Sequence, residues 1–171
     1  MSVFHENWFG EASQEAVEGL VKMTSHLDGN VVEVGCWEGR STLAIARACR
    51  PAVVHAVDTW QGSPGEISSH LAGERDVLAT FLANTDGHNI DAYIMDWRTY
   101  FADHAGPTRF LHIDGEHTYE QVADNIDAAL PHMVAGGVIC GDDVHHPPVQ
   151  QAVLERFPGA LSVATLWWTF V

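Results

Sequence analysis

The amino-acid sequence predicts an α/β fold in which a mostly parallel β-sheet is covered by helices on both faces. Apolar segments of strand length recur along the chain, and segments with helical periodicity lie between them. Acidic residues directly follow several of these predicted strands. The chain of 171 residues is most simply one domain, since a chain of this size buries about two-thirds of its unfolded surface.

Five apolar segments have the length and composition of buried strands. They are residues 30–35, 52–58, 89–96, 109–114 and 136–143. The C-terminal residues 161–171 show no helical pattern and predict one or two closing strands. Strands that alternate with helices lie parallel to one another in a single sheet.

Helical periodicity is present in three segments between these strands. Residues 41–49 predict the first helix, 74–85 the second and 118–134 the third. Thr118 and Gln121 form a T-x-x-Q capping box, which fixes the start of the third helix.

Charge and cysteine content narrow the classes of function. The chain has 23 acidic and 8 basic residues, and so a formal net charge of -15. Such a surface repels phosphate backbones and anionic lipid, which argues against nucleic acid and membrane as partners. Cys36, Cys49 and Cys140 are odd in number and widely spaced, as is typical of reduced thiols. With neither a signal-peptide pattern nor an apolar span, the sequence predicts a cytoplasmic protein.

Acidic residues stand at the carboxyl ends of four predicted strands. They are Asp58, Asp96, Asp114 and the pair Asp142 and Asp143. Ligands of open α/β sheets bind beyond the carboxyl ends of the strands, so these side chains can face one crevice. One such acid is most often a helix cap or a solvated turn, but their recurrence favours a shared site.

Residues 31–48, VVEVGCWEGRSTLAIARA, predict a strand, a glycine-containing turn and a helix. Gly35 and Gly39 let the backbone approach a ligand, and the helix start at Ser41 offers free N–H groups. The G-x-x-x-G spacing differs from the G-x-G-x-x-G of dinucleotide-binding dehydrogenases. A P-loop lysine is missing as well, which argues against an ATPase.

The motif E-x-G-x-x-x-G-x-S over residues 33–41, with Asp58 ending the next strand, resembles the class I S-adenosylmethionine-dependent methyltransferases. The resemblance implies a Rossmann-like, doubly wound, mostly parallel seven-stranded sheet with an antiparallel C-terminal strand. It also implies S-adenosylmethionine as the cofactor. The residues implied to bind this cofactor are Glu33, Gly35, Gly39, Ser41, Asp58, Thr59, Trp60, Asp96, Trp97 and Asp114.

The resemblance also assigns roles within this set. Asp58 is expected to accept hydrogen bonds from both ribose hydroxyls, as a carboxylate is able to do. Asp96 is expected to meet the adenine amino group, with a tryptophan nearby for stacking. For Glu33 a structural alternative stays open, that of a buried acid paired with Arg40 or Arg47.

Asp114, Asp142 and Asp143 offer the oxygen ligands that Mg²⁺ prefers. The order of IDGEHTY (113–119) and GGVICGDD (136–143) resembles the metal-dependent O-methyltransferases, and more narrowly the macrocin O-methyltransferase and cephalosporin-methoxylation group. The resemblance covers about residues 30–145. It implies Mg²⁺ or Mn²⁺ held by these three aspartates. It further implies a small-molecule hydroxyl, such as that of a glycoside or a phenol, as the methyl acceptor.

The resemblance implies His117 as the general base, with Glu116 as the alternative. His117 precedes a capped helix, whose positive dipole end disfavours a second positive charge and so predicts a neutral imidazole. A histidine that only hydrogen-bonds its own turn is the structural alternative. His145 and His146 are expected to shape the substrate entrance rather than to bind metal.

Two segments are candidates to cover the site. We interpret residues 1–29 as an N-terminal helical lid segment before a cofactor-binding core over 30–171. His5, Trp8 and Phe9 either form a short lid, or the two aromatic residues pack the first helix against the core. Residues 58–70, rich in glycine, serine and proline, predict a mobile flap.

Three questions stay open at the level of sequence. The apolar C-terminus LWWTFV predicts either an interface between copies of the chain, and hence a homo-oligomer, or a buried final strand. A module that binds S-adenosylmethionine without catalysis is one alternative function, and the intact set of aspartates argues against it. A metal-dependent hydrolase is another, and it would have no use for a ribose-binding acid.

Overall fold

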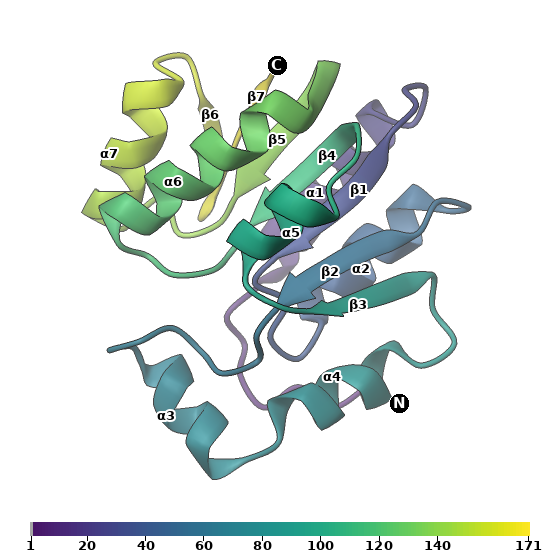
Figure 1. Cartoon of the computed structure of the whole chain (residues 1–171), viewed down its shortest axis with the longest axis vertical. Helices are drawn as coiled ribbons and strands as arrows, with labels where there is room; N and C mark the ends of the chain where they lie inside the picture. The colour runs from purple at the N-terminus through teal and green to yellow at the C-terminus, as the bar shows by residue number, and fades with distance from the viewer. Residues whose placement is uncertain (1) are drawn as a thin grey trace.

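The structure is a computed structural model, and it describes residues 2–171. Figure 1 shows one twisted sheet with the strand order β3-β2-β1-β4-β5-β7-β6. The strands are β1 (Asn30–Val34), β2 (Val54–Asp58), β3 (Ile90–Ile94), β4 (Thr108–Ile113), β5 (Met133–Gly141), β6 (Leu161–Val163) and β7 (Leu166–Phe170). The first five pair in parallel, and β7 runs antiparallel to both β5 and β6. The predicted fold class is confirmed.

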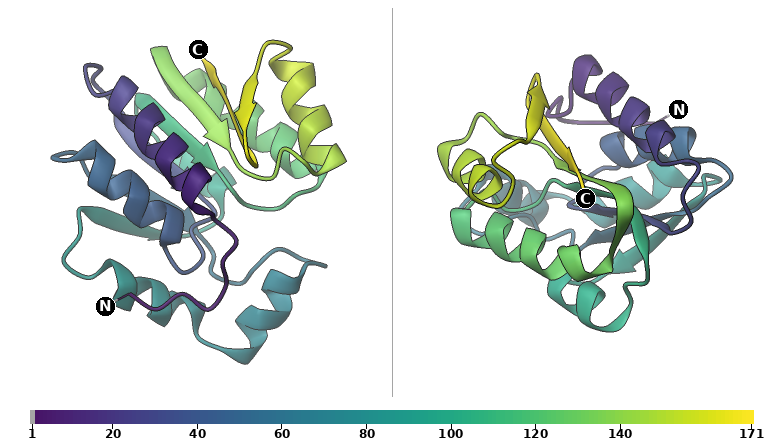
Figure 2. Two further views of the ribbon diagram at one scale, coloured as in Figure 1. Left: turned by 180° about the vertical axis from the view of Figure 1, so that it is seen from behind. Right: turned by 90° about the horizontal axis from the view of Figure 1, so that it is seen from above.

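Helices cover both faces of this sheet (Figure 2). They are α1 (Glu11–Met23), α2 (Arg40–Cys49), α3 (Ile67–Glu74), α4 (Val77–Thr85), α5 (Trp97–Asp103), α6 (Tyr119–Ala129) and α7 (Pro147–Arg156), with a 3-10 turn η1 (Leu130–His132). Apolar side chains of α5, α6 and α7 pack on one face, and those of α1 and α2 pack on the other. All six residues of β4 are buried as a result.

The central strands alternate between these two faces. Val32 and Val34 of β1 face α5, α6 and α7, whereas Val31 faces α1 and α2. Glu33, which alternates with Val32, therefore lies on the α1/α2 side of the sheet. Its register partner on β4 is His112.

Two predicted helix boundaries were wrong. The segment 74–85 contains the end of α3 and all of α4, and the Asp76 side chain caps α4 by accepting a hydrogen bond from Ala79 N at 2.9 Å. The helix predicted over 118–134 ends at Ala129, because Pro131 cannot continue an α-helix. The predicted cap is present, since Thr118 accepts from the backbone of Gln121.

The N-terminal segment divides into two parts. The helix α1 buries Val17, Leu20 and Val21 against α2 and the sheet, so this helix belongs to the core. Residues 2–9 precede it without helical structure and pass alongside α4 (Figure 2). The helical part of the segment predicted as a lid thus belongs to the core, and a lid formed by residues 2–9 stays a prediction.

The C-terminal apolar segment forms β7, an inner strand between β5 and β6. Leu166 and Trp167 are buried there, in agreement with the interpretation as a buried final strand. A homo-oligomer stays a prediction. Across the described part of the chain, no helix combines the length and the apolar character that a bilayer crossing requires.

Candidate active site

A cavity of about 1110 Å³ lies beyond the carboxyl ends of the parallel strands. Each of the first five strands contributes to its lining through the residues at its end: Gly35, Asp58, Asp96, Asp114 and Asp142. The prediction that the strand-end acids face a common crevice is thus confirmed. A cavity of this size is at the upper end of the range for ligand sites, and it can hold two small molecules side by side.

Gly35 brings the loop after β1 against the end of β4. Its backbone has a φ of 84°, and a Cβ atom there would lie 2.0 Å from the carbonyl oxygen of Asp114. Only glycine fits this position. Gly39 also has a positive φ, but it packs against Phe81 of α4 and is not among the residues lining the cavity. Ser41, in the first turn of α2, does line it.

Asp58 holds the same loop from the end of β2. Its Oδ2 accepts hydrogen bonds from the backbone N–H groups of Cys36 at 2.7 Å and Trp37 at 3.0 Å. Its Oδ1 accepts from the backbone of Trp60 at 2.7 Å. Burial raises the pKa of this carboxyl, and the three backbone donors oppose the rise. Oδ2 is thereby fully used, whereas Oδ1 retains one lone pair that can accept from a ligand in the cavity.

The two residues after Asp58 face opposite ways. Thr59 lines the cavity, as the resemblance implied. Trp60 does not, because its φ of 54° turns the indole onto Phe81, with ring centroids 4.7 Å apart. Its Nε1 donates to the carbonyl of Trp37 at 2.8 Å. We therefore correct the assignment of Trp60 to cofactor binding, since its side chain is a core residue under the loop.

Glu33 is buried on the α1/α2 side of the sheet and does not line the cavity. Its Oε1 lies 3.0 Å from Nδ1 of His112 on the neighbouring strand. Burial alone would lower the pKa of His112, but the hydrogen bond and charge of Glu33 raise it. The partner is thus neither Arg40 nor Arg47, and the structure does not bring the Glu33 side chain to the cofactor position.

Asp96 and Trp97 line the cavity at the start of α5. Asp96 caps this helix by accepting from the backbone of Arg98 at 2.8 Å. The guanidinium of Arg98 lies 4.0 Å from the ring centroid of Trp97, so one face of this indole is already covered.

The acids after β4 and β5 crowd together. Burial and the negative charge of Asp142 raise the pKa of Asp114 to about 8, although His112 and His117 oppose the rise. Oδ1 of Asp142 is buried and has no hydrogen-bond partner among residues 2–171. Ligand atoms of Asp114, His117 and Asp143 lie within 4.8 Å of one another. His117 thus lies in one cluster with Asp114 and Asp143, and Asp142, whose charge acts on Asp114, adjoins this cluster.

Two carboxylates hold the ring of His117. Its Nδ1 lies 3.0 Å from Oε2 of Glu66, and its Nε2 lies 2.7 Å from Oδ2 of Asp143. Burial alone would lower the pKa of His117, but Asp143 and Glu66 raise it to about 9. The expectation of a neutral imidazole was wrong. A helix dipole is worth about 0.3–1 kcal/mol. The hydrogen bond between Nδ1 and the charged Glu66 is worth about 1.5–3 kcal/mol, and so outweighs it.

Glu66 is the site residue that the sequence interpretation missed. It lies in the segment 58–70, just before α3, and also accepts a hydrogen bond from the backbone N–H of His117 at 3.1 Å. The contact joins positions 51 residues apart in sequence. The one sequence signal that could have found Glu66 is its place in a segment predicted to fold over the site. Glu116, the alternative base, lines the cavity beside His117.

Residues 2–9 border the cavity on the side of the β1–α2 loop. Val3 and Asn84 exchange two backbone–side-chain hydrogen bonds, of 2.7 and 2.8 Å. Glu6 accepts from the indole Nε1 of Trp37 at 3.0 Å and pairs with Arg75. This segment is thereby fixed to α4 and to the cofactor-side loop.

Phe9 packs against the core, as one sequence alternative stated, whereas Trp8 lies at the cavity edge, where the other alternative places a lid. Phe9 is buried against His112, with ring centroids 5.7 Å apart, and it packs the start of α1 onto the core. Trp8 is half exposed and lies 5.3 Å from Trp37 at the cavity edge. Trp8 is therefore the residue placed where a lid would be.

The strand order, the glycine loop and the strand-end acids together define a class I methyltransferase fold. Residues 32–144 match the family described as "Methyltransferase domain". The match covers more than half of the chain, and the chain belongs to this methyltransferase family.

Solved structures agree on the fold. The O-methyltransferase NovP is 20% identical with a TM-score of 0.64, over 92% of this chain and 78% of that one. TomG of Streptomyces achromogenes, in complex with S-adenosylmethionine, is 15% identical with a TM-score of 0.65, over 95% of this chain and 82% of that one. CalS11, a TDP-rhamnose 3'-O-methyltransferase, is 16% identical with a TM-score of 0.64, over 92% of this chain and 77% of that one.

A curated relative matches a shorter segment. This relative, an ATP synthase lysine N-methyltransferase of Rattus norvegicus, is 38% identical over 52 residues. The matched segment covers 30% of the present chain and 24% of that protein.

Proposed function

We propose that this methyltransferase transfers the methyl group of S-adenosylmethionine to a hydroxyl of a small molecule in a Mg²⁺-dependent reaction. The observation that carries the proposal is one cavity with two chemically different ends. Asp58 and the Gly35 loop form one end, and the crowded acids with His117 form the other. A cofactor and an acceptor need such a shared space, because the reacting atoms must approach to about 3–3.5 Å.

The cofactor end of the cavity offers the carboxylate of Asp58 and the backbone at Gly35, where no side chain blocks a ligand. Asp58 would accept a hydrogen bond from a ribose hydroxyl through the lone pair on Oδ1 that its three backbone donors leave free. Gly35 and Ser41 would let the amino-acid part lie against the loop. Asp96 and Trp97 would receive the adenine. TomG, a structure of the same fold, is described as a complex with S-adenosylmethionine.

The acid cluster fits a divalent cation on two observations. The buried Oδ1 of Asp142 lacks a partner among the described residues, and burial together with the neighbouring carboxylates raises the pKa of Asp114 far above its usual range. Asp114, Asp142 and Asp143 would hold Mg²⁺ or Mn²⁺, which favour oxygen ligands. The ion would supply positive charge that lowers the pKa of an acceptor hydroxyl.

With a cation on Asp114 and Asp143, whose positive charge would offset the two carboxylates that keep the ring protonated, His117 would take the acceptor proton at Nε2. Glu66 fixes Nδ1 as the nitrogen that carries a hydrogen, which leaves Nε2 to exchange a proton on the cavity side. Glu66 is thus a positioning residue, comparable to the acid that orients the histidine of a hydrolase triad. Glu116 is the alternative base. Residues 2–9 would form the lid, with Trp8 at its edge.

The identity of the acceptor is proposed from chemistry and from the substrates that proteins of related fold are named for. CalS11 is named for a TDP-sugar, and a caffeoyl-CoA O-methyltransferase of Staphylococcus aureus shares the fold at 14% identity and a TM-score of 0.61. A glycoside or a phenol is therefore the favoured acceptor. The charge of -15 argues against nucleic acid and membrane as partners. Membership of a methyltransferase family argues against the hydrolase alternative.

Calorimetry and methyl transfer test the proposal together. S-adenosylhomocysteine is titrated into the protein with Mg²⁺ and with a chelator, and labelled S-adenosylmethionine is then offered with a panel of sugar and catechol acceptors. We expect cofactor binding in both conditions and transfer only with the divalent ion. Binding without transfer to any acceptor would favour a binding module, and full transfer in chelator would rule out the metal-dependent mechanism.

A further inference from the structure

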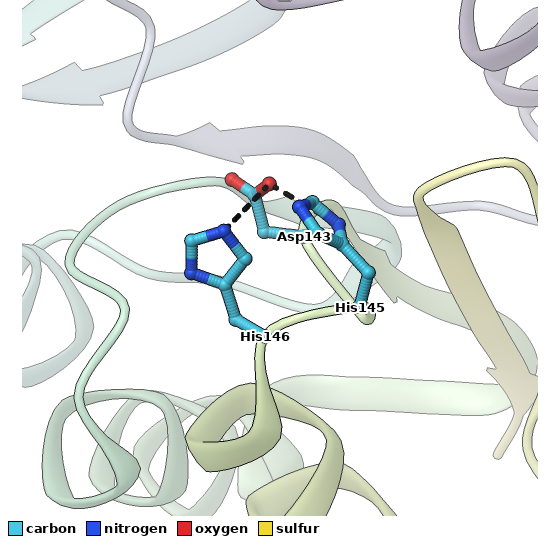
Figure 3. A group of neighbouring side chains, drawn as sticks. All are labelled: Asp143, His145 and His146. Atoms are coloured by element: carbon cyan, nitrogen blue, oxygen red, sulfur yellow. Dashed lines mark ion pairs between the residues drawn. The ribbon is translucent and has the colours of Figure 1, made fainter.

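The turn after β5 brings one carboxylate and two imidazoles together, and the ring of His146 also lies 5.4 Å from that of His117, between centroids. Figure 3 shows the rings of His145 and His146 converging on one oxygen of Asp143. Oδ1 of Asp143 lies 3.7 Å from Nδ1 of His145 and 3.9 Å from Nε2 of His146. All three ligand atoms lie within 4.8 Å of one another.

Backbone contacts fix the turn beneath these side chains. The N–H of His146 donates to the carbonyl of Asp143 at 2.9 Å, and the N–H of Val144 donates to the carbonyl of Thr165 at 3.0 Å. Helix α7 begins directly afterwards with Pro147, whose φ is restricted by its ring. Only side-chain rotations then separate the present positions of the ligand atoms from a closed site.

The required adjustment is small. Tetrahedral Zn²⁺ with ligands at about 2.1 Å places neighbouring donor atoms about 3.4 Å apart. The two separations from Asp143, 3.7 and 3.9 Å, exceed this by about 0.3 and 0.5 Å. Both histidines are about half exposed, so their rings can turn, and one position of the ion stays open to water or to a ligand.

The donor set decides which ion fits. Imidazole suits Zn²⁺, Co²⁺, Ni²⁺ and Fe²⁺, whereas Mg²⁺ prefers sites made of oxygen. We propose that Asp143, His145 and His146 form a second cation site, which takes a borderline divalent ion of the Zn²⁺ or Co²⁺ type. This proposal goes beyond the sequence expectation that the two histidines shape the substrate entrance.

The site shares one residue with the acid cluster but uses its other oxygen. Oδ2 of Asp143 faces His117 at 2.7 Å, and Oδ1 faces the histidine pair. A borderline ion on Oδ1 would therefore compete for the same carboxylate that the Mg²⁺ proposal requires. The second site does not depend on that proposal, because its three ligands are complete by themselves.

Cobalt titration of the full chain tests the inference. Co²⁺ is added in the presence of excess Mg²⁺, and binding is followed by calorimetry and by the visible d–d absorption of the ion. The variants are His145→Gln, His146→Gln and the double variant. The matched control is His70→Gln, which removes an exposed histidine whose Nε2 lies 3.2 Å from Oε1 of Glu74.

We expect the parent to bind one Co²⁺ under excess Mg²⁺, each single variant to bind it at least about tenfold more weakly, and the double variant to lose the site. The control variant should bind as the parent does. Equal Co²⁺ affinity and an equal spectrum in parent and double variant would overturn the inference. An equal loss in His70→Gln would reduce it to adventitious surface binding. Circular dichroism establishes that each variant is folded.

Discussion

Asp58 serves both the architecture of the site and its proposed ligand. Its carboxylate holds the backbone of the glycine loop at Cys36 and Trp37, and it would hold the ribose with the one lone pair that remains on Oδ1. This double use means that its removal affects binding in two ways. The ligand loses an acceptor, and the loop loses the contact that keeps it in position.

We expect Asp58→Ala to weaken binding of S-adenosylhomocysteine by about 1.5–3 kcal/mol, the usual value for charge-assisted hydrogen bonds. Isothermal titration calorimetry measures this directly. Asp58→Asn is the control, since its amide oxygen still accepts from the loop backbone while the charge is lost. If Asp58→Ala bound the ligand as tightly as the parent does, the assignment of this residue would be wrong.

His117 and Glu116 are neighbouring candidates for one proton transfer. Loss of a general base commonly lowers turnover by about 10²–10⁴ and leaves ligand affinity intact. We expect this loss in His117→Ala and a smaller one in Glu116→Gln, with unchanged binding of S-adenosylhomocysteine in both. Turnover lost only in Glu116→Gln would transfer the role to that carboxylate. Normal turnover with lowered stability in His117→Ala would make the histidine structural.

At the scale of an element, the flap over residues 58–70 reaches the proposed base through the carboxylate of Glu66. A neutral side chain at this position removes the charge that fixes the tautomer of His117. We expect Glu66→Gln to lower turnover about 10–100-fold, the usual effect of losing the residue that orients a functional histidine.

The matched control for this prediction is Glu74→Gln, which removes the same charge from the exposed end of α3. Glu66→Asp is the second comparison, because it keeps the charge but shortens the reach. A positioning role predicts partial recovery in Glu66→Asp and no change in Glu74→Gln. Equal turnover in the parent and Glu66→Gln would contradict the role.

At the scale of the whole molecule, the acid cluster adds to a net charge of -15. Like charges in a buried site destabilise the folded state, and functional sites often keep such strain. We expect Asp114→Asn to raise the free energy of unfolding without divalent ions by on the order of 1 kcal/mol, since one pKa unit corresponds to about 1.4 kcal/mol.

Mg²⁺ should raise the melting temperature of the parent, because a ligand that binds only the folded state stabilises it. The same ion should have little effect on Asp114→Asn. Thermal unfolding of both proteins with Mg²⁺ and with chelator measures the two effects. A parent whose melting temperature is indifferent to millimolar Mg²⁺ would argue against the cation site.

The sequence predicted what depends on local pattern. Strand periodicity and the acids at strand ends were sufficient to place Asp58, Asp96, Asp114 and Asp142 in one cavity. Contacts between segments that are far apart in the chain could not be predicted from the sequence. The pairing of Glu33 with His112 depends on the register of β1 against β4, and the Glu66 contact depends on how the flap folds back. The direction of Trp60 depends on a single left-handed backbone position.

The alkylation rates of the three buried thiols report on local and global opening of the fold. Cys36, Cys49 and Cys140 are all buried and free, and burial raises the pKa of each thiol, so reagents meet the unreactive protonated form. Cys36 lies in the loop that Asp58 holds, whereas Cys140 lies within β5. Alkylation of Cys36 should therefore follow local opening of the loop, and that of Cys140 should follow global unfolding. In peptide-resolved mass spectrometry, S-adenosylhomocysteine should slow the labelling of Cys36 more than that of Cys140. Equal slowing of both cysteines would mean that the loop opens only when the whole fold unfolds.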